Sequence, residues 1–303
     1  MSHKTESLDR KRAAMTKAFI DAIETSGKWL PDYISTSPRN FLTGRPYNGI
    51  NRLMLPVRQM INGWAHPIFA GIGQIKAAGG RVKAEEWTNA TWVFFWGRTE
   101  KKVTVDGEEE KRVYWFPKVF KVWNLDQTEG IKESKVKGLP GTADGAESHD
   151  ALDALLHGYM DAEGITFAHM DGCPHYVPSM DSIGLPAPEQ YQSTEGYYRS
   201  LAHECVHSTG APSRLDREIL NMMGDAKYSR EELVAQLGAA FTGAEYGLTN
   251  ADVEARDAAY LASWVSVLKA DPNVLFDAAS DAEKALKFMT TKAGVESPEP
   301  VTV

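Results

Sequence analysis

The segment LAHECVHSTG, residues 201–210, decides how this chain is interpreted, because it holds His203, Glu204 and His207 in the order H-E-x-x-H. On a helix, histidines four residues apart share one face, so both imidazoles can reach one metal ion. Glu204 is displaced by roughly 100° around the axis and stands where a general base for an attacking water is needed. The spacing predicts a metal site with a catalytic glutamate. The alternative is a buried helix that carries two hydrogen-bonded histidines.

A catalytic zinc ion needs a third protein ligand, and the candidate lies in SREELVAQLGAAF, residues 229–241. Glu232 and Gln236 are four apart on a predicted helix, so Glu232 can bind the metal while Gln236 supports a histidine ring. Ser229 with Glu232 also fits a capping box, in which Glu232 would bond only backbone. Glu231 is the alternative ligand. We expect one Zn²⁺ per chain, with Mn²⁺ or another divalent metal as alternatives. Lone histidines near strands are more often structural, which makes three others weaker candidates: His157, His169 and His175.

Composition limits the class of protein. The chain has 303 residues, 43% of them hydrophobic, which is enough for one large domain or two smaller ones. No run of about 18 apolar residues occurs, so no membrane span is expected. The charged N-terminal segment lacks the apolar stretch of a signal peptide. With only two cysteines, Cys173 and Cys205, a reducing, cytoplasmic location is expected.

Charge is distributed unevenly along the chain. Residues 1–130 carry 20 basic and 14 acidic side chains, a net charge of +6, whereas residues 131–303 carry 13 and 27, a net charge of −14. A basic half joined to an acidic half suggests two domains with different partners, and the basic one could face an anion such as DNA. The alternative is that +6 describes only a solvated surface.

The order of the predicted elements indicates an α+β protein with two domains. Strands are expected where aromatic and β-branched residues gather, and helices where apolar residues recur with helical spacing. In the N-terminal half, helices are predicted over residues 7–27 and 67–80 and at the start of NRLML, and strands over 91–97 and 112–125 with a turn at Asp106-Gly107. In the C-terminal half, helices are predicted over 150–159, 193–210, 229–241, 252–271 and 273–289, with strands at 165–169 and within 174–186.

Aromatic side chains concentrate in the basic half. Seven of the eight tryptophans lie at or before Trp123, and Trp92, Phe94 and Trp96 would share one face of a strand. Unpaired bases stack on such rings while nearby cations follow the phosphates. The alternative is that most of these rings fill a core. Candidate contacts for single-stranded DNA are Trp96, Lys118 and Lys121 on the predicted strands and Arg45, Tyr47, Asn48 and Asn51 in RPYNGIN.

A peptidase would also need a surface for an extended substrate. DSIGLP, residues 181–186, could be an edge strand that pairs with a peptide. Tyr176 nearby could donate a hydrogen bond to an oxyanion, although a buried aromatic ring is the commoner explanation.

With both halves considered, the chain resembles the ArdC-type antirestriction proteins of conjugative plasmids and phages over about residues 10–290. The similarity rests on segments in the same order: RPYNGIN (45–51), VFFWG (93–97), VFKVWNLDQTEG (119–130), YVPSMDSIGLP (176–186), YYRSLAHECVHSTGAPSRLDR (197–217), EELVAQLGAAF (231–241) and AAYLASWVSVLKADPNVLFDAASDAEKA (258–285).

The resemblance implies a single-stranded-DNA-binding domain over residues 1–131, a linker over 132–149, a zincin-like metallopeptidase domain over 150–294 and a tail over 295–303. We expect the first domain to be α+β and the second to be mainly helical with a small antiparallel sheet. The resemblance also implies that His203, His207 and Glu232 bind the metal, that Glu204 is catalytic, and that the protein shields incoming DNA from host restriction.

The chain departs from this family at one loop. Where the family commonly has Lys-Gly-Glu-Lys-Gly, this sequence keeps Lys83 and Glu85 but has Ala84, Glu86 and Trp87 in place of the glycines and a lysine. Lys83 remains a candidate phosphate contact, and Trp87 could replace charge by stacking on a base. Gln236 stands where the family frequently has an acidic residue, which would weaken support for a histidine ring.

Two other functions fit the same sequence. In one, the metal is structural, and protection comes from coating DNA or blocking the restriction enzyme. In the other, the chain is a protease for proteins bound to DNA. If the chain is an antirestriction metallopeptidase, its substrate would be a restriction enzyme or another DNA-associated protein.

Overall fold

The computed structural model describes residues 3–29, 31, 34–105, 108–131, 136, 145–217, 219, 226–248, 258–295 and 301. The chain forms two compact units. The helical unit comprises residues 1–37, 48–62 and 140–298, and the sheet unit comprises 38–47, 63–139 and 299–303. The predicted turn at 106–107 and most of the predicted linker lie outside the described residues. The domain boundaries at 131 and 150 stay a prediction, because a compact unit need not be a domain that folds alone.

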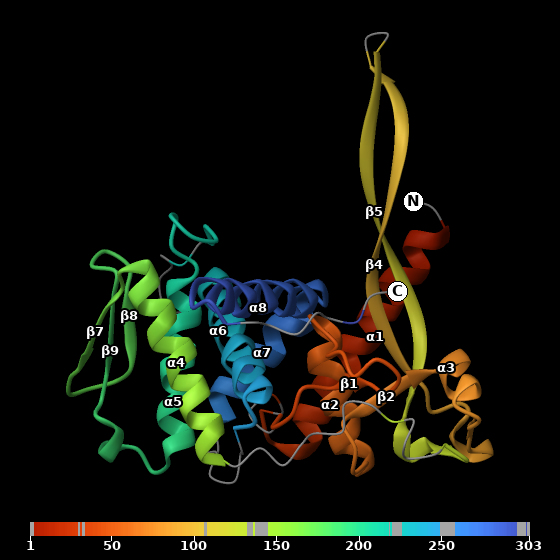
Figure 1. The fold of residues 1–303 in the computed structure, drawn as a ribbon, viewed down its shortest axis with the longest axis horizontal. Helices are drawn as coiled ribbons and strands as arrows, with labels where there is room; N and C mark the ends of the chain where they lie inside the picture. The colour runs from red at the N-terminus through yellow and green to blue at the C-terminus, as the bar shows by residue number, and fades with distance from the viewer. Residues whose placement is uncertain are drawn as a thin grey trace. The chain divides into compact units, whose positions relative to one another are not determined.

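The sheet unit is built on four strands in the order β1-β2-β5-β4. β1 (Arg39–Asn40) runs parallel to β2 (Ile68–Gly71), and the other neighbours are antiparallel. β4 (Thr91–Val105) and β5 (Glu108–Asn124) pair along their whole length, and they extend past the rest of the sheet as a two-stranded ribbon (Figure 1). Both predicted strands are therefore confirmed, and both are longer than expected because the charged residues beyond them continue the ladder.

Short elements close the base of this sheet. They are α3 (Ile72–Ala77), β3 (Arg81–Val82), η2 (Ala84–Glu86), η3 (Leu125–Gln127) and β6 (Thr128–Glu129). Phe41, Ile68, Ile75 and Trp123 belong to the core that these elements cover. The predicted helix over 67–80 is wrong in its first half, where Ile68–Gly71 pairs as β2 and buries its apolar side chains in this core. Periodicity cannot separate a short buried strand from a buried helix.

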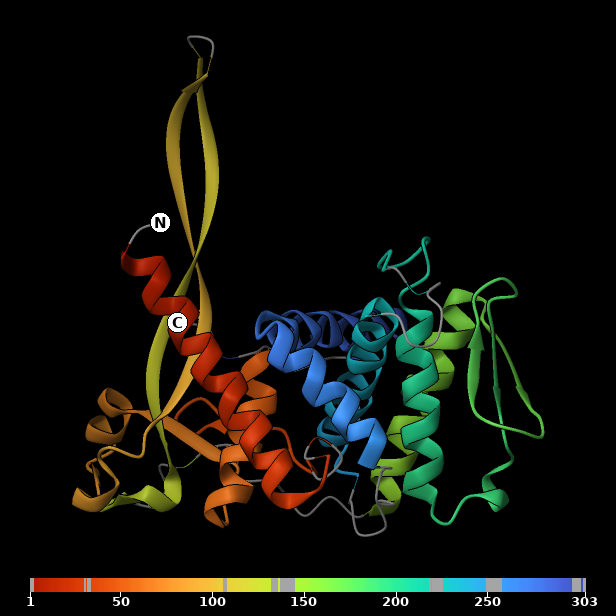
Figure 2. The same cartoon turned by 180° about the vertical axis from the view of Figure 1, so that it is seen from behind.

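The helical unit contains seven α-helices among the described residues: α1 (His3–Ser26), α2 (Ile50–Asn62), α4 (Gly145–Glu163), α5 (Thr194–Ser208), α6 (Ala226–Glu245), α7 (Ala258–Ala270) and α8 (Asn273–Lys292). α6 packs against both α5 and α8, and α1 contacts α7 and α8 (Figure 2). The predicted α+β architecture is confirmed. In the described part of the chain, no helix is both long and apolar enough to span a membrane.

A three-stranded sheet lies against α5 in the helical unit (Figure 1). Its order is β7-β9-β8, with β7 at Thr166–His169, β8 at His175–Val177 and β9 at Ser182–Leu185; η5 (Pro188–Gln190) follows. β7 runs parallel to β9, and β8 runs antiparallel to it, so this small sheet is mixed and not purely antiparallel as expected.

α2, which belongs to the helical unit, carries a buried arginine. Arg52 is 3% exposed, and its Nη1 lies 2.7 Å from Glu245 Oε2 on α6 and 3.0 Å from Ser37 Oγ. A buried guanidinium needs such partners, since an unpaired buried charge is costly. Arg52 therefore anchors α2 to α6.

Candidate metal centre

α5 presents the two histidines on one face, as the spacing predicts. Ser193 caps the helix by accepting a hydrogen bond from the Gly196 N–H at 3.1 Å. Leu201 and Cys205 are fully buried and hold the opposite side of the helix in the core. The core therefore fixes the rotation of α5, and the side chains of His203 and His207 come together one turn apart.

Three ligand atoms converge between α5 and α6. The Nε2 atoms of His203 and His207 are 3.1 Å apart. Glu232 Oε1 lies 3.3 Å from His207 Nε2, and Glu232 Oε2 lies 3.7 Å from His203 Nε2. Within the described residues, these three form the cluster of histidine, cysteine and acidic side chains that could hold a metal, with all ligand atoms within 4.8 Å of one another.

These separations suit a tetrahedral ion. Bonds of about 2.0–2.1 Å at tetrahedral angles put neighbouring ligand atoms roughly 3.3 Å apart, and the separations in the structure are 3.1, 3.3 and 3.7 Å. Two histidines and one glutamate would leave a fourth position for water or substrate, which is the ligand set of catalytic rather than structural zinc sites. The side chains present therefore fit a divalent metal.

The electrostatics of the cluster also favour a cation. Burial lowers the pKa of the His207 imidazole, but its hydrogen bonds to Glu231 and Glu232 outweigh burial and raise that pKa to about 10. Of the two carboxylates, Glu232 lies on the Nε2 side of the ring, where it would also stabilise a metal cation. Metal binding would then have to displace a proton.

Glu204 lies beside the ligands without joining them. Its side chain is buried, and burial, reinforced by the charge of Glu232, raises its pKa to about 7. The backbone N–H of Tyr176, on β8, hydrogen-bonds to the carboxylate. A carboxylate with a pKa near neutrality is suited to accept a proton and return it.

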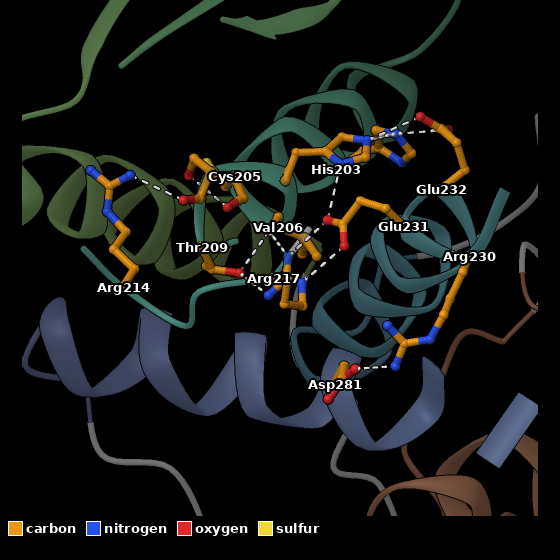
Figure 3. A network of polar contacts seen from close by, with 12 residues as sticks. His203, Cys205, Val206, Thr209, Arg214, Arg217, Arg230, Glu231, Glu232 and Asp281 are labelled. Atoms are coloured by element: carbon orange, nitrogen blue, oxygen red, sulfur yellow. Dashed lines mark hydrogen bonds and ion pairs between the residues drawn. The ribbon is translucent and has the colours of Figure 1, made fainter. Parts of the chain in front are cut away.

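Glu231 is not placed as a ligand. Its Oε1 lies 3.3 Å from Nδ1 of His207, the ring nitrogen that faces away from the cluster, and both oxygens accept hydrogen bonds from Arg217 (Figure 3). Burial opposes its ionisation, but the bonds from His207 and Arg217 lower the pKa of Glu231. Sequence reasoning missed Arg217, because an arginine ten residues beyond the second histidine gives no signal in helical spacing.

The capping-box alternative for Glu232 is wrong. α6 begins at Ala226, so Ser229 lies inside the helix and cannot be its cap. Gln236 lies one turn after Glu232 and is half-buried, and its support of a histidine ring stays a prediction. The three weaker histidines lie outside the cluster: His157 lies beside Asp153, His169 beside the Tyr197 hydroxyl, and His175 beside the Cys173 carbonyl.

Two expectations about the substrate side need correction. The Tyr176 hydroxyl donates to Asp181 at 2.8 Å, and its pKa is raised to about 12 by burial and by that carboxylate. Because the hydroxyl donates its single proton to Asp181, this side chain does not donate to an oxyanion. DSIGLP contains β9, which is the central strand, and the edge strand near α5 is instead β8. Sequence alone could not order three short strands.

The predicted DNA contacts in RPYNGIN are mostly not on a surface. Tyr47 is 1% exposed, hydrogen-bonded to Asn40 and Phe69, and its pKa is raised to about 12 by burial. Asn51 is 1% exposed in α2. Neither can contact a base, so both assignments are wrong. Arg45 is exposed and Asn48 is half-buried, and their contacts with DNA stay predictions.

The ribbon carries a line of rings on one side. The register pairs Trp92 with Lys121 and Trp96 with Pro117, so these side chains and Phe94 share a face, as their spacing predicts. Lys121 Nζ lies 5.1 Å from the centroid of the Trp92 ring. We call Trp87, Trp92, Phe94, Trp96 and Lys121 the aromatic face.

Trp87 continues this face at the base of the ribbon. Its ring stacks on that of Trp123, with centroids 5.4 Å apart, and it is 53% exposed. Trp123 donates from Nε1 to the Glu86 carbonyl, which holds η2 beside the strand. Lys83 Nζ donates to the Asp126 carbonyl, and Lys118 lies on the opposite face with its Nζ 5.6 Å from the Phe116 centroid. Their predicted phosphate contacts are thus less favoured than that of Lys121.

Family models match both halves of the chain. A family model for the N-terminal domain of the anti-restriction factor ArdC matches residues 9–123, and one for a zincin-like metallopeptidase matches residues 154–281. The second match covers α5 and α6, the helices that carry the three candidate ligands. The chain therefore contains a domain of the zincin-like metallopeptidase class.

Solved structures and curated relatives extend the likeness to nearly the whole chain. The metal-free crystal structure of the antirestriction protein ArdC from plasmid R388 is 30% identical with a TM-score of 0.72, covering 94% of this chain and 99% of that one. A Mn(II)-bound structure of that protein matches with the same TM-score at 28% identity, covering 93% of this chain and 97% of that one. The chain belongs to the ArdC antirestriction family.

Two relatives differ in length. The uncharacterized protein y4eC of Sinorhizobium fredii is 30% identical over 288 residues, which cover 91% of this chain and 90% of the relative. DNA primase TraC of Escherichia coli is 33% identical over 268 residues, 83% of this chain, but the match spans only 24% of the primase. The chain thus spans about a quarter of TraC, and what the whole primase does cannot be transferred to it.

Proposed function

We propose that this chain protects incoming DNA from restriction by binding single-stranded DNA and hydrolysing a protein at a zinc centre. The observation that carries the proposal is the convergence of His203, His207 and Glu232 within 4.8 Å, with buried Glu204 beside them. A helix with two structural histidines would not require a third ligand from another helix at tetrahedral distances.

A bound zinc or manganese ion would polarise the scissile carbonyl and make water more acidic. The chain supplies the remaining chemistry. Glu204 takes the proton of the attacking water and returns it to the leaving amine. The hydrogen bond from the Tyr176 N–H helps to hold the Glu204 carboxylate in place. β8 provides an edge on which an extended peptide can add as a strand next to Glu204.

The experiment compares metal content and protection in the native chain and Glu204→Gln. We expect about one zinc per native chain purified without added metal, and full retention in Glu204→Gln. Protection of transferred DNA against a restricting host should fall to the level of the empty vector in Glu204→Gln. Unchanged protection by this variant would refute the peptidase and favour the non-enzymatic shield. Protection of host viability in restriction-free cells after protein–DNA cross-linking would instead favour the protease for DNA-bound proteins.

DNA binding is assigned to the aromatic face. Trp87, Trp92 and Trp96 are 53%, 37% and 62% exposed, which is unusual for large rings that only fill a core. Rings in a row accept unpaired bases whatever their sequence, and Lys121 beside Trp92 offers a cation to the backbone. We therefore favour single-stranded DNA in the cytoplasm as the ligand, and the restriction enzyme or another DNA-associated protein as the peptidase substrate.

A further inference from the structure

The loop that follows α5 folds back onto the helix. Arg217 N donates to the Gly210 carbonyl at 2.9 Å, and Leu215 N donates to the Thr209 carbonyl at 2.9 Å. This reversal brings the Arg217 side chain into the interior between α5 and α6, where it is 7% exposed (Figure 3). A loop arginine buried to this degree must be matched by acceptors.

Arg217 uses its donors on two helices at once. Its Nε and Nη2 form a fork on Glu231 of α6, at 3.0 Å from Oε2 and 2.9 Å from Oε1. The same Nη2 reaches the Val206 carbonyl at 2.8 Å, and Nη1 reaches Thr209 Oγ1 at 2.9 Å, both at the end of α5. Bidentate pairs of this kind fix orientation as well as distance.

The carboxylate held by this fork contacts a metal ligand from behind. Glu231 Oε1 lies 3.3 Å from His207 Nδ1. When a neutral His207 ring carries its proton on Nδ1 and donates it to Glu231, the lone pair is on Nε2. Nε2 is the atom that faces His203 and Glu232. Carboxylates in this position set the ring orientation and basicity of metal-binding histidines.

The sequence leaves room for the arginine. A Cβ on Gly210 would lie 3.1 Å from Arg217 Nη2 and would also collide with Ile219 Cγ2. Glycine at 210 therefore allows the loop to pass close enough for Arg217 to reach Glu231.

We propose that Arg217 is a positioning residue of the metal centre: through Glu231 it fixes the His207 ring, so that the loop after α5 sets the metal affinity. The inference rests on the proposed metal centre and adds to it a residue that touches no ligand atom. Arg217 also neutralises Glu231, which keeps this carboxylate behind the ring and leaves Glu232 as the acidic ligand.

The test measures Zn²⁺ affinity by competition with a chromophoric chelator. Arg217→Gln should bind zinc about 10–100-fold more weakly than the native chain, as loss of such support does at other metal sites. Arg217→Lys should be intermediate, because lysine keeps the charge but not the fork. The control is Arg230→Gln, on the helix that carries Glu231; its side chain pairs with Asp281 (Figure 3). It should stay within twofold of native.

A folded Arg217→Gln chain with native affinity overturns the proposal. Should that variant fail to fold, Glu231→Gln replaces it, since it leaves the bonds of Arg217 to Val206 and Thr209 in place; unchanged affinity there overturns the proposal equally. The second readout is the Nδ1 proton of His207 in NMR spectra of chelator-treated protein. It should be protected from exchange in the native chain and lost in Arg217→Gln. A native chain that keeps this proton but binds no zinc refutes the metal centre, and not the positioning of His207 by Arg217 through Glu231.

Discussion

At the proposed metal centre three candidate ligand atoms from two helices lie within 4.8 Å of one another, whereas the aromatic face presents its rings singly along one strand and the adjoining turn. The first arrangement works only when complete, because a site with three protein ligands loses most of its metal affinity when any one of the ligands is removed. The second is additive, because each ring would stack on its own base. Substitutions should therefore abolish function at one region and reduce it stepwise at the other.

The largest effect is expected at the metal ligands. His203→Ala and Glu232→Ala should each weaken Zn²⁺ binding about a hundredfold to a thousandfold, because roughly 10–16 kcal/mol of binding energy is shared among four ligand positions. Competition titration with metal analysis measures this, with His157→Ala as the control histidine outside the cluster. If Glu232→Ala stays within threefold of native, the third ligand lies elsewhere and the two-helix cluster is not the site.

A buried ring in the sheet unit should matter for stability and not for DNA. Tyr47→Ala removes a fully buried aromatic side chain and should lower the free energy of unfolding by about 3–5 kcal/mol. Tyr47→Phe keeps the packing, loses the hydrogen bonds to Asn40 and Phe69, and should cost about 1 kcal/mol. Urea unfolding gives both values. Weaker binding of single-stranded DNA by the folded Tyr47→Phe chain would place this residue back at the interface.

Stepwise loss is expected along the aromatic face. Trp96→Ala should weaken binding of a single-stranded oligonucleotide by about 1–3 kcal/mol, roughly 5–150-fold, the usual value of one stacked base. The matched control is Phe120→Ala, an exposed ring on the opposite face of the ribbon. Lys121→Ala should lower the slope of log K against log salt concentration by about one released ion. Lys118→Ala should leave that slope unchanged. Equal losses for Trp96→Ala and Phe120→Ala in a fluorescence anisotropy titration would rule out a one-sided interface.

The same contrast explains what the sequence could predict. The geometry of H-E-x-x-H could be predicted, because helical spacing alone puts His203 and His207 on one face. Strand alternation likewise placed Trp92 and Trp96 together. Tyr47 and Asn51 were selected for their chemical type, and only the tertiary fold decides whether such a side chain is buried. The order of β7, β9 and β8 and the approach of Arg217 to Glu231 also depend on contacts between distant segments.

The smallest effect concerns the acid stability of the helical unit. Arg214 hydrogen-bonds to Asp181 at 2.6 and 2.8 Å and lowers the pKa of that carboxyl. A carboxylate whose pKa is lower in the folded chain stabilises the fold at pH values above its unfolded pKa of about 3.9. This stabilisation is lost as the pH falls through the pKa of the folded state. The Asp181 side chain is 39% exposed, so solvent screening should keep its contribution below about 1 kcal/mol.

Asp181→Asn isolates this contribution. Asp181 has a φ of 45°, which asparagine adopts nearly as readily, so the backbone should be undisturbed. Thermal unfolding should show the variant less stable than the native chain at pH 7, with the difference shrinking to nothing between about pH 5 and pH 2 because the native carboxyl becomes neutral there. Glu189→Gln, an exposed carboxylate in η5, serves as the control. A difference that persists unchanged at pH 2 would mean that Asp181 acts through the Tyr176 hydrogen bond and its geometry, not through its charge.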